Sequence, residues 1–429
     1  MQKFFIPLFL GILFFSLITS GDNLSFAQEA FDADAATEAY LASIPAEDRA
    51  KSDAYFEGGY WLTLWGTLYA IGAAFILLHF GISRKMRDWG EKVTRFKFFH
   101  RFAYAGQYLI ASFIISFPLT WYAGLFREQQ YDLATQTFGP WFWEQMIGLG
   151  LNVAILGLAL TLLYAGISWK PKTWWIWSGG GVAVFIMFLI TITPVFISPL
   201  FNDYKPLEEG EVRTEILAMA RANMVPAEEV YWFDASRQTT RISANVSGMF
   251  GTTRISLNDN LLNGATLPEI KAVMAHEIGH YVTNLIITLV LPFSVIIMAG
   301  FGFVHANFNK VNAKFGARWG VKNIADPAGL PILSILLAVF FFVMTPFLNT
   351  IVRENERLAD AYGLNAAGEP DGFAMIALKL GAYRKLDPTA LEEFIFYDHP
   401  SGRSRIQMSM EWKAEHLGEM ADEPALAEE

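Results

Sequence analysis

The chain of 429 residues contains no cysteine. This absence excludes disulfides, thiolate metal sites and a cysteine nucleophile, so any metal ion has to be held by histidine and carboxylate side chains. Charged residues are also scarce, at 17% against about a quarter in an average soluble domain. The net charge is −10. Nucleic-acid binding is therefore not expected.

Long apolar runs stand where the charges are missing, and hydrophobic residues reach 53% of the chain. Several windows hold more than about 18 residues with little or no charge, which is enough to cross a bilayer as a helix. Six such spans are expected, near 60–82, 103–125, 146–168, 174–200, 284–305 and 328–351. The sequence therefore predicts a multi-pass α-helical membrane protein in contact with a lipid bilayer.

The N-terminal segment 1–27 has one lysine, an apolar run and small residues at Ser25 and Ala27. This pattern fits a secretory signal peptide cleaved after Ala27 and equally an uncleaved first transmembrane helix, which would be a seventh span. The rest of the chain alternates between polar and apolar stretches. We divide it into a polar surface segment (28–59), a transmembrane bundle (60–200), a polar segment (201–283), two further spans (284–351) and a polar C-terminal segment with an acidic tail (352–429).

Lysine and arginine gather in alternate loops of the predicted bundle. The loops 83–101, 168–175 and 309–323 are basic, whereas 127–145 has Arg127 alone. The positive-inside rule places basic loops in the cytoplasm. The polar segments at 201–283 and 352–429 are then expected on the opposite face, which is the periplasmic face of the inner membrane if the cell is bacterial.

The stretch "VMAHEIGHY" places His276 and His280 four residues apart, with Glu277 beside the first. On a helix this spacing puts both imidazoles on one face, as one tetrahedral metal ion requires. Glu277 can then accept a proton from an attacking water without being a ligand. The preceding "LPEIKAV" has apolar residues three and four positions apart, which predicts a helix. The pattern is the H-E-x-x-H arrangement of metallopeptidases.

A catalytic zinc usually has a third protein ligand. After the last predicted span the chain returns to the same face with "NTIVRENERLADAYGLNAAG", where Glu354, Glu356 and Asp360 are candidates on one helix. Glu356 and Asp360 are four residues apart, so one can bind metal while the other orients a ligating imidazole. A charged surface helix without a metal explains the same spacing as well.

Three motifs in order, "HEIGH", "ENERLAD" and "DHPSGRSRI", resemble the integral-membrane zinc endopeptidases called type I CAAX prenyl proteases. The stretches "FREQQYDLATQTFGPWF", "ISPLFNDYKPLEEGEV" and "GTTRISLNDNLL" match as well, and the resemblance runs from about 60 to 412. It implies that His276, His280 and Glu356 hold one zinc ion and that Glu277 is the general base. It also implies a ring of spans that encloses a chamber.

The resemblance extends to residues around the metal. It implies that Asp360 orients a ligating histidine, that His399 binds the carbonyl oxyanion and that Arg405 supports the site. The stretch "ANVSGMFGTTRISLNDN" (244–260) predicts a strand, a turn and a strand. The family has an Asn-Ala pair here that contacts substrate, whereas this chain has Ser243-Ala244, so Ser243 and Asn245 are both candidates for substrate binding.

The predicted protein is thus a helical membrane bundle with a small α+β metallopeptidase domain that hydrolyses peptide bonds. For the substrate, the resemblance implies removal of a C-terminal tripeptide from prenylated CAAX proteins. The loop charges favour instead an envelope protease that cleaves misfolded or membrane-associated proteins, lipidated or not. A non-catalytic transporter or scaffold is the alternative from another class, and it would need charged residues along the spans or loss of a site residue.

Overall fold

Long helices dominate the fold, because an apolar chain can satisfy its backbone polar groups in lipid only within helices or closed barrels. The structure is a computed structural model that describes residues 31–248, 251–283 and 286–422. Within these ranges six helices are long and apolar enough to cross a membrane. Their bounds are Ala46–His79, Lys97–Gln130, Phe138–Trp169, Trp174–Leu200, Ile287–Trp319 and Pro327–Ala367. The predicted multi-pass helical fold is confirmed, whereas the predicted signal peptide or first helix at 1–27 lies outside the described residues.

The spanning helices extend beyond most of the predicted apolar windows. The main elements are α2 (Ala46–His79), α4 (Lys97–Trp121) with α5 (Arg127–Gln130), α6 (Phe138–Leu151) with α7 (Gly157–Trp169), α8 (Trp174–Ile192), α12 (Leu291–Trp319) and α13 (Leu330–Ala367). Four of the spans contain a π-helical turn, at Tyr122–Phe126, Asn152–Leu156, Thr193–Ile197 and Ile286–Val290. Helix α13 passes through the predicted boundary at 351, so one helix carries both a membrane span and the motif "ENERLAD".

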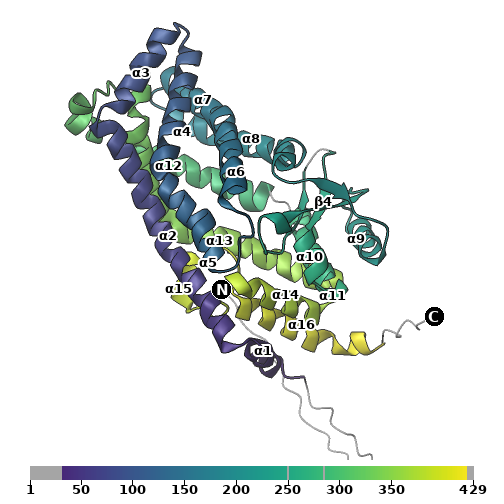
Figure 1. The fold of residues 1–429 in the computed structure, drawn as a ribbon. Helices are drawn as coiled ribbons and strands as arrows, with labels where there is room; N and C mark the ends of the chain where they lie inside the picture. Colours follow the sequence, from purple (N-terminus) through teal and green to yellow (C-terminus); the bar gives the residue numbers. More distant parts are fainter. Residues whose placement is uncertain (1–30, 249–250, 284–285, 423–429) are drawn as a thin grey trace, which may run out of the picture. The chain divides into compact units, whose positions relative to one another are not determined.

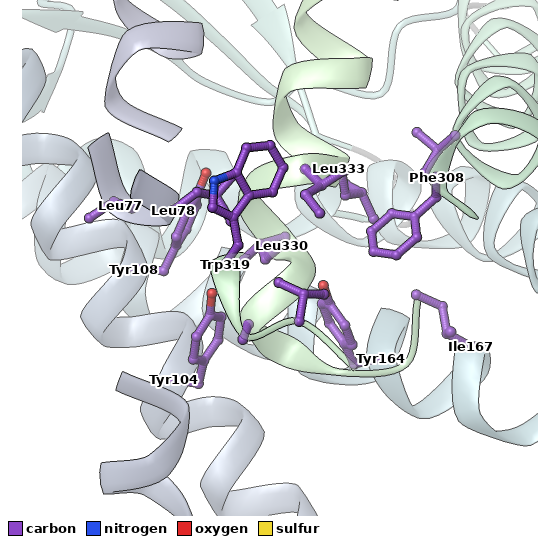
Figure 2. Packing of buried hydrophobic residues seen from close by; sticks show 14 of the residues in the cluster. Leu77, Leu78, Tyr104, Tyr108, Tyr164, Ile167, Phe308, Trp319, Leu330 and Leu333 are labelled. Atoms are coloured by element: carbon purple, nitrogen blue, oxygen red, sulfur yellow. The ribbon is translucent and has the colours of Figure 1, made fainter. Parts of the chain in front are cut away.

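One end of the bundle is closed by a buried aromatic and aliphatic cluster, in which Figure 2 shows Tyr104, Tyr164, Phe308 and Trp319 among their neighbours. Helix α3 (Ile82–Val93) covers this end. The Arg87 guanidinium on α3 donates a hydrogen bond to the backbone carbonyl of Gly320 (3.0 Å). It donates another to the carboxylate of Asp326 (2.7 Å). The bonds join two of the predicted basic loops at this end.

A four-stranded sheet follows the first four spans. Its strands are β1 (Tyr204–Pro206), β2 (Val230–Phe233), β3 (Ala244–Ser247) and β4 (Arg254–Asn258), in the order β1-β2-β4-β3. Strand β4 is parallel to β2 and antiparallel to β3, with Ala244 opposite Leu257. The two strands predicted within 244–260 are thereby confirmed, part of the turn between them lies outside the described residues, and β3 forms an edge of the sheet.

The sheet packs on the helix that carries "HEIGH". Ile255 and Leu257 of the central strand β4 are fully buried against Ile270 and Met274 of α11 (Leu267–Val282) and against α9 (Glu211–Ala222). Figure 1 shows α11 between the sheet and the C-terminal helices. These are α14 (Pro370–Leu380), α15 (Ala390–Phe396) and α16 (Gly402–Asp422); the short helices α1 (Ala33–Ala42) and α10 (Asp259–Gly264) complete the described part.

Candidate metal centre

Helix α11 is fixed at its first turn and along one face. The Thr266 backbone N–H donates to the Glu269 carboxylate (2.6 Å), which Lys379 of α14 also bonds (2.7 Å). Ile270, Met274 and Ile278, each four residues apart, are buried in the sheet core. Because these apolar residues face the sheet, His276, Glu277 and His280 are turned toward α13 and a cavity.

Two glycines let α11 and α13 approach closely. A Cβ added at Gly279 would lie 3.0 Å from the carbonyl oxygen of Ala359, and one added at Gly363 would lie 2.9 Å from the backbone nitrogen of His276. Any larger residue at these positions would push the helices apart. The contact brings the histidines of α11 over the acidic residues of α13.

The three predicted ligands come together at this contact. The donor atoms of His276, His280 and Glu356 all lie within 4.8 Å of one another. The two Nε2 atoms are 3.1 Å apart, and the Glu356 carboxylate oxygens lie 3.2 Å from His276 Nε2 and 3.4 Å from His280 Nε2. Two imidazole nitrogens and a carboxylate oxygen that converge in this way are a donor set suited to a divalent transition metal.

The electrostatics of the site also favour a cation. Burial lowers the pKa of His276, but the carboxylates of Asp360 and Glu356 outweigh this effect and raise the pKa to about 10. Asp360 lies 2.7 Å from His276 Nδ1 and is fully buried. Arg405 donates two hydrogen bonds to Asp360, at 3.0 and 2.6 Å. The residues present therefore fit a bound metal ion, with Asp360 placed to hold His276 in the tautomer whose Nε2 faces the cluster.

Glu277 faces a cavity of about 180 Å³ beside this cluster. Burial raises the pKa of its carboxyl group, and within the described part of the chain no group forms a hydrogen bond or ion pair with it. A carboxylate with no partner and a raised pKa is suited to accept a proton and return it. Ser243 and Ala244 line the same cavity, whereas Asn245, further along β3, is not part of its lining.

His399 lies at the edge of the cluster, with Nε2 3.2 Å from Glu356 Oε2 and Nδ1 2.8 Å from the Asp398 carboxylate. Its loop is held to α13 by Arg353, which donates to the backbone carbonyls of Glu393 (2.8 Å) and Tyr397 (2.7 Å). The sequence analysis missed Asp398, although it directly precedes His399. It also missed two cavity residues from the loop after α14, Tyr383 and Arg384, for which no motif gave a signal.

Comparisons with known proteins cover nearly the whole described chain. Residues 32–203 match the family described as CAAX prenyl protease N-terminal, five membrane helices, and residues 206–413 match peptidase family M48. The uncharacterized metalloprotease YhfN of Bacillus subtilis is 30% identical over 335 residues, 78% of this chain and 78% of its own. CAAX prenyl protease 1 of Saccharomyces cerevisiae is 28% identical, over 69% of this chain and 68% of its own.

A crystal structure of Ste24p from S. mikatae superimposes with a TM-score of 0.72 at 22% identity, over 88% of this chain and 94% of that chain, and so shares the fold. The fold, the cluster of three possible metal donors and the relatives define an integral-membrane metallopeptidase. The chain belongs to peptidase family M48, and the resemblance to CAAX prenyl proteases is confirmed.

Proposed function

We propose that the chain is a zinc-dependent endopeptidase in which His276, His280 and Glu356 hold one zinc ion and Glu277 is the general base. One observation carries this proposal. Three donor atoms that the sequence separates by up to 80 residues lie within 4.8 Å of one another, beside a carboxylate that has no partner among the described residues. If the cluster were only structural, we would expect Glu277 to have a hydrogen-bond partner and not to face the cavity unpaired.

When bound, the zinc ion supplies Lewis-acid chemistry at the peptide carbonyl. Glu277 takes a proton from the attacking water and passes it to the leaving amine. His399 turns Nε2 toward the cluster because Asp398 holds Nδ1, and we assign its Nε2–H the stabilisation of the carbonyl oxygen as negative charge develops there. Asp360 and Arg405 keep His276 oriented throughout.

The edge strand β3 offers a place for the substrate backbone. Its one paired neighbour in the described sheet is β4, so its outer edge can add an extended peptide as a further strand. Ser243 lies where this edge meets the cavity that Glu277 lines. We propose that Ser243 contacts the substrate close to the cleaved bond, and that Asn245 contacts it further along the same strand.

For the membrane side, we propose a bacterial inner membrane with the site on the periplasmic face. Two contacts support a common end for the basic loops: Arg87 with the Gly320 carbonyl (3.0 Å) and Arg101 with Ser168 (2.7 Å). The weakly basic loop instead pairs with the peptidase segment, at Ala134 and Thr239. Misfolded or membrane-associated envelope proteins are then the proposed substrates, and a prenylated C-terminal peptide is the alternative that the yeast relative's name supports.

The test uses the purified full-length protein in detergent. We expect about one zinc per chain, cleavage of casein or of a prenylated CAAX peptide, and loss of that cleavage in Glu277→Gln with zinc content unchanged. Cleavage of casein would support the envelope role, whereas cleavage of the prenylated peptide alone would support the alternative. Absence of zinc, or equal cleavage by Glu277→Gln, would refute the peptidase proposal.

A further inference from the structure

A second cavity adjoins the one that Glu277 lines. Its volume is about 370 Å³, and it lies between α2, α13 and the loop that follows α14. Tyr383 and Arg384 line both cavities. These two residues therefore lie at the boundary between the two cavities, where both cavities can reach them.

Arg384 differs from the other arginines that line these cavities, because no described residue pairs with its guanidinium. Arg405 is paired with Asp360 (2.6 Å), and Arg241 is paired with Glu128 (2.6 Å). Over the residues that the structure describes, no side chain or backbone group bonds the guanidinium of Arg384. Burial, with the nearby Arg405 cation, lowers the pKa of Arg384. Because burial and the Arg405 cation both disfavour the charged guanidinium, an anion placed beside Arg384 would stabilise it.

The charged residues that line the second cavity also favour binding of an anion. Of the described residues that line it, Arg127, Arg241 and Arg384 are cationic and Asp398 alone is anionic. Asp398 is already bonded to His399, at 2.8 Å. Arg127 donates to the backbone carbonyl of Tyr55, which carries no net charge. The cavity thus keeps an excess of positive charge, with Arg384 as its unpaired donor.

We propose that Arg384, at the wall between the two cavities, is the specificity-determining residue of a subsite that binds a carboxylate of the peptide substrate. A guanidinium presents two parallel N–H groups that match the two oxygens of a carboxylate. The carboxylate is either the C-terminal one of the substrate chain or that of an aspartate or glutamate side chain. The inference rests on the proposed peptidase function, since it assigns a subsite of that same site.

The first experiment measures cleavage by the zinc-loaded, full-length protein. Four fluorogenic peptides differ only beyond the cleaved bond: a free C-terminal acid, its amide, the amide with one glutamate, and the amide with glutamine in its place. We expect KM about tenfold lower or more for a carboxylate-bearing peptide than for its neutral partner, because hydrogen bonds to charged groups are the strong ones. The acid–amide pair reports the chain end and the glutamate–glutamine pair reports the side chain.

Arg384→Gln should abolish this preference by raising KM for the carboxylate peptide, with kcat and zinc content little changed. Arg384→Lys should retain part of it, because the charge remains without the planar fork. The matched control is Arg213→Gln, which removes an arginine of α9 that pairs with Glu229 (3.0 Å) and lines neither cavity. This control should keep the full preference.

A second measurement separates the subsite from the peptidase function. Binding of the four fluorescent peptides to full-length Glu277→Gln, with and without Arg384→Gln, is followed by anisotropy without any cleavage. Carboxylate preference that disappears with Arg384→Gln supports the subsite even if the wild-type protein cleaves no peptide, a result that would refute the peptidase proposal alone. Equal affinity for all four peptides, no measurable binding, or the same preference in both variants would overturn the subsite.

Discussion

The Asp360 carboxylate links His276, one of the three proposed ligands, to Arg405. Asp360 Oδ1 lies 2.7 Å from His276 Nδ1 and 2.6 Å from Arg405 Nη2, and Oδ2 accepts from Arg405 Nε at 3.0 Å. The residue is fully buried. A buried charge is tolerated only when its neighbours satisfy it, so the imidazole and the guanidinium are held in place by the same requirement.

Asp360→Asn tests this arrangement. The amide keeps the shape but loses the charge, and its NH2 group replaces the oxygen that accepts from Arg405 Nε. The hold of this residue on His276 is therefore weakened. We expect zinc affinity to fall roughly 10- to 100-fold, measured by competition with a chelator of known affinity. Asp371→Asn, which removes an exposed carboxylate bonded to Tyr40 (2.7 Å) and Lys413 (2.6 Å), is the control. Unchanged zinc affinity in Asp360→Asn would contradict the orienting role.

At the scale of elements, the site depends on the contact between α11 and α13. Gly363 lies under the backbone of His276, and Gly279 lies over Ala359. The rigid backbone on both sides leaves no flexible side chain that could move aside. The separation of the two helices, and with it the distance from the histidines to Glu356, is therefore set by the absence of a Cβ at each glycine.

Gly363→Ala should force the helices apart. Overpacking of this kind costs about 1–3 kcal/mol, and we expect a lower melting temperature together with weaker zinc binding. Gly148→Ala, on α6 with nothing within 4 Å of the added Cβ, is the control and should leave both unchanged or raise stability slightly. If Gly363→Ala kept wild-type melting and zinc affinity, the close contact would not be limiting.

The sequence predicted the elements with strong periodicity better than it predicted where those elements end and how they connect. The H-E-x-x-H helix and the strands at 244–260 follow from spacing within one short stretch. The continuity of α13 through 351 could not be predicted in this way. The change there from apolar to charged residues resembles a helix end, although helices tolerate both kinds of residue. Strands β1 and β2 pair with partners distant in sequence, so no strand–turn–strand pattern marks them. Asp398 and Arg384 reach the site only through tertiary packing.

At the scale of the whole molecule, the two ends of the bundle have different chemistry. One end combines the basic loops with a buried aromatic cluster that includes Trp319. The other end carries the sheet, the metal cluster and both cavities that reach it. The candidate site and its two cavities are thereby confined to one end of the bundle. The enclosed chamber that the family resemblance implies stays a prediction.

The proposed orientation can be read with reporter fusions in a bacterial host. Alkaline phosphatase, which is active only outside the cytoplasm, should be active when fused after Glu429 and inactive when fused in the loop at Lys172. Green fluorescent protein at the same two positions should give the opposite pattern. Phosphatase activity at Lys172 and none after Glu429 would place the site on the cytoplasmic face and favour the prenylated substrates.

The helix that carries Glu356 is also a membrane span, and this ties the proposed enzyme's activation to its biogenesis. A nascent chain inserted only as far as His280 has two of the three donors, and the third arrives after two more crossings of the bilayer. A truncated or misthreaded chain can therefore not assemble the full donor set. Correct insertion of the last two spans is therefore a condition for the proposed site to form.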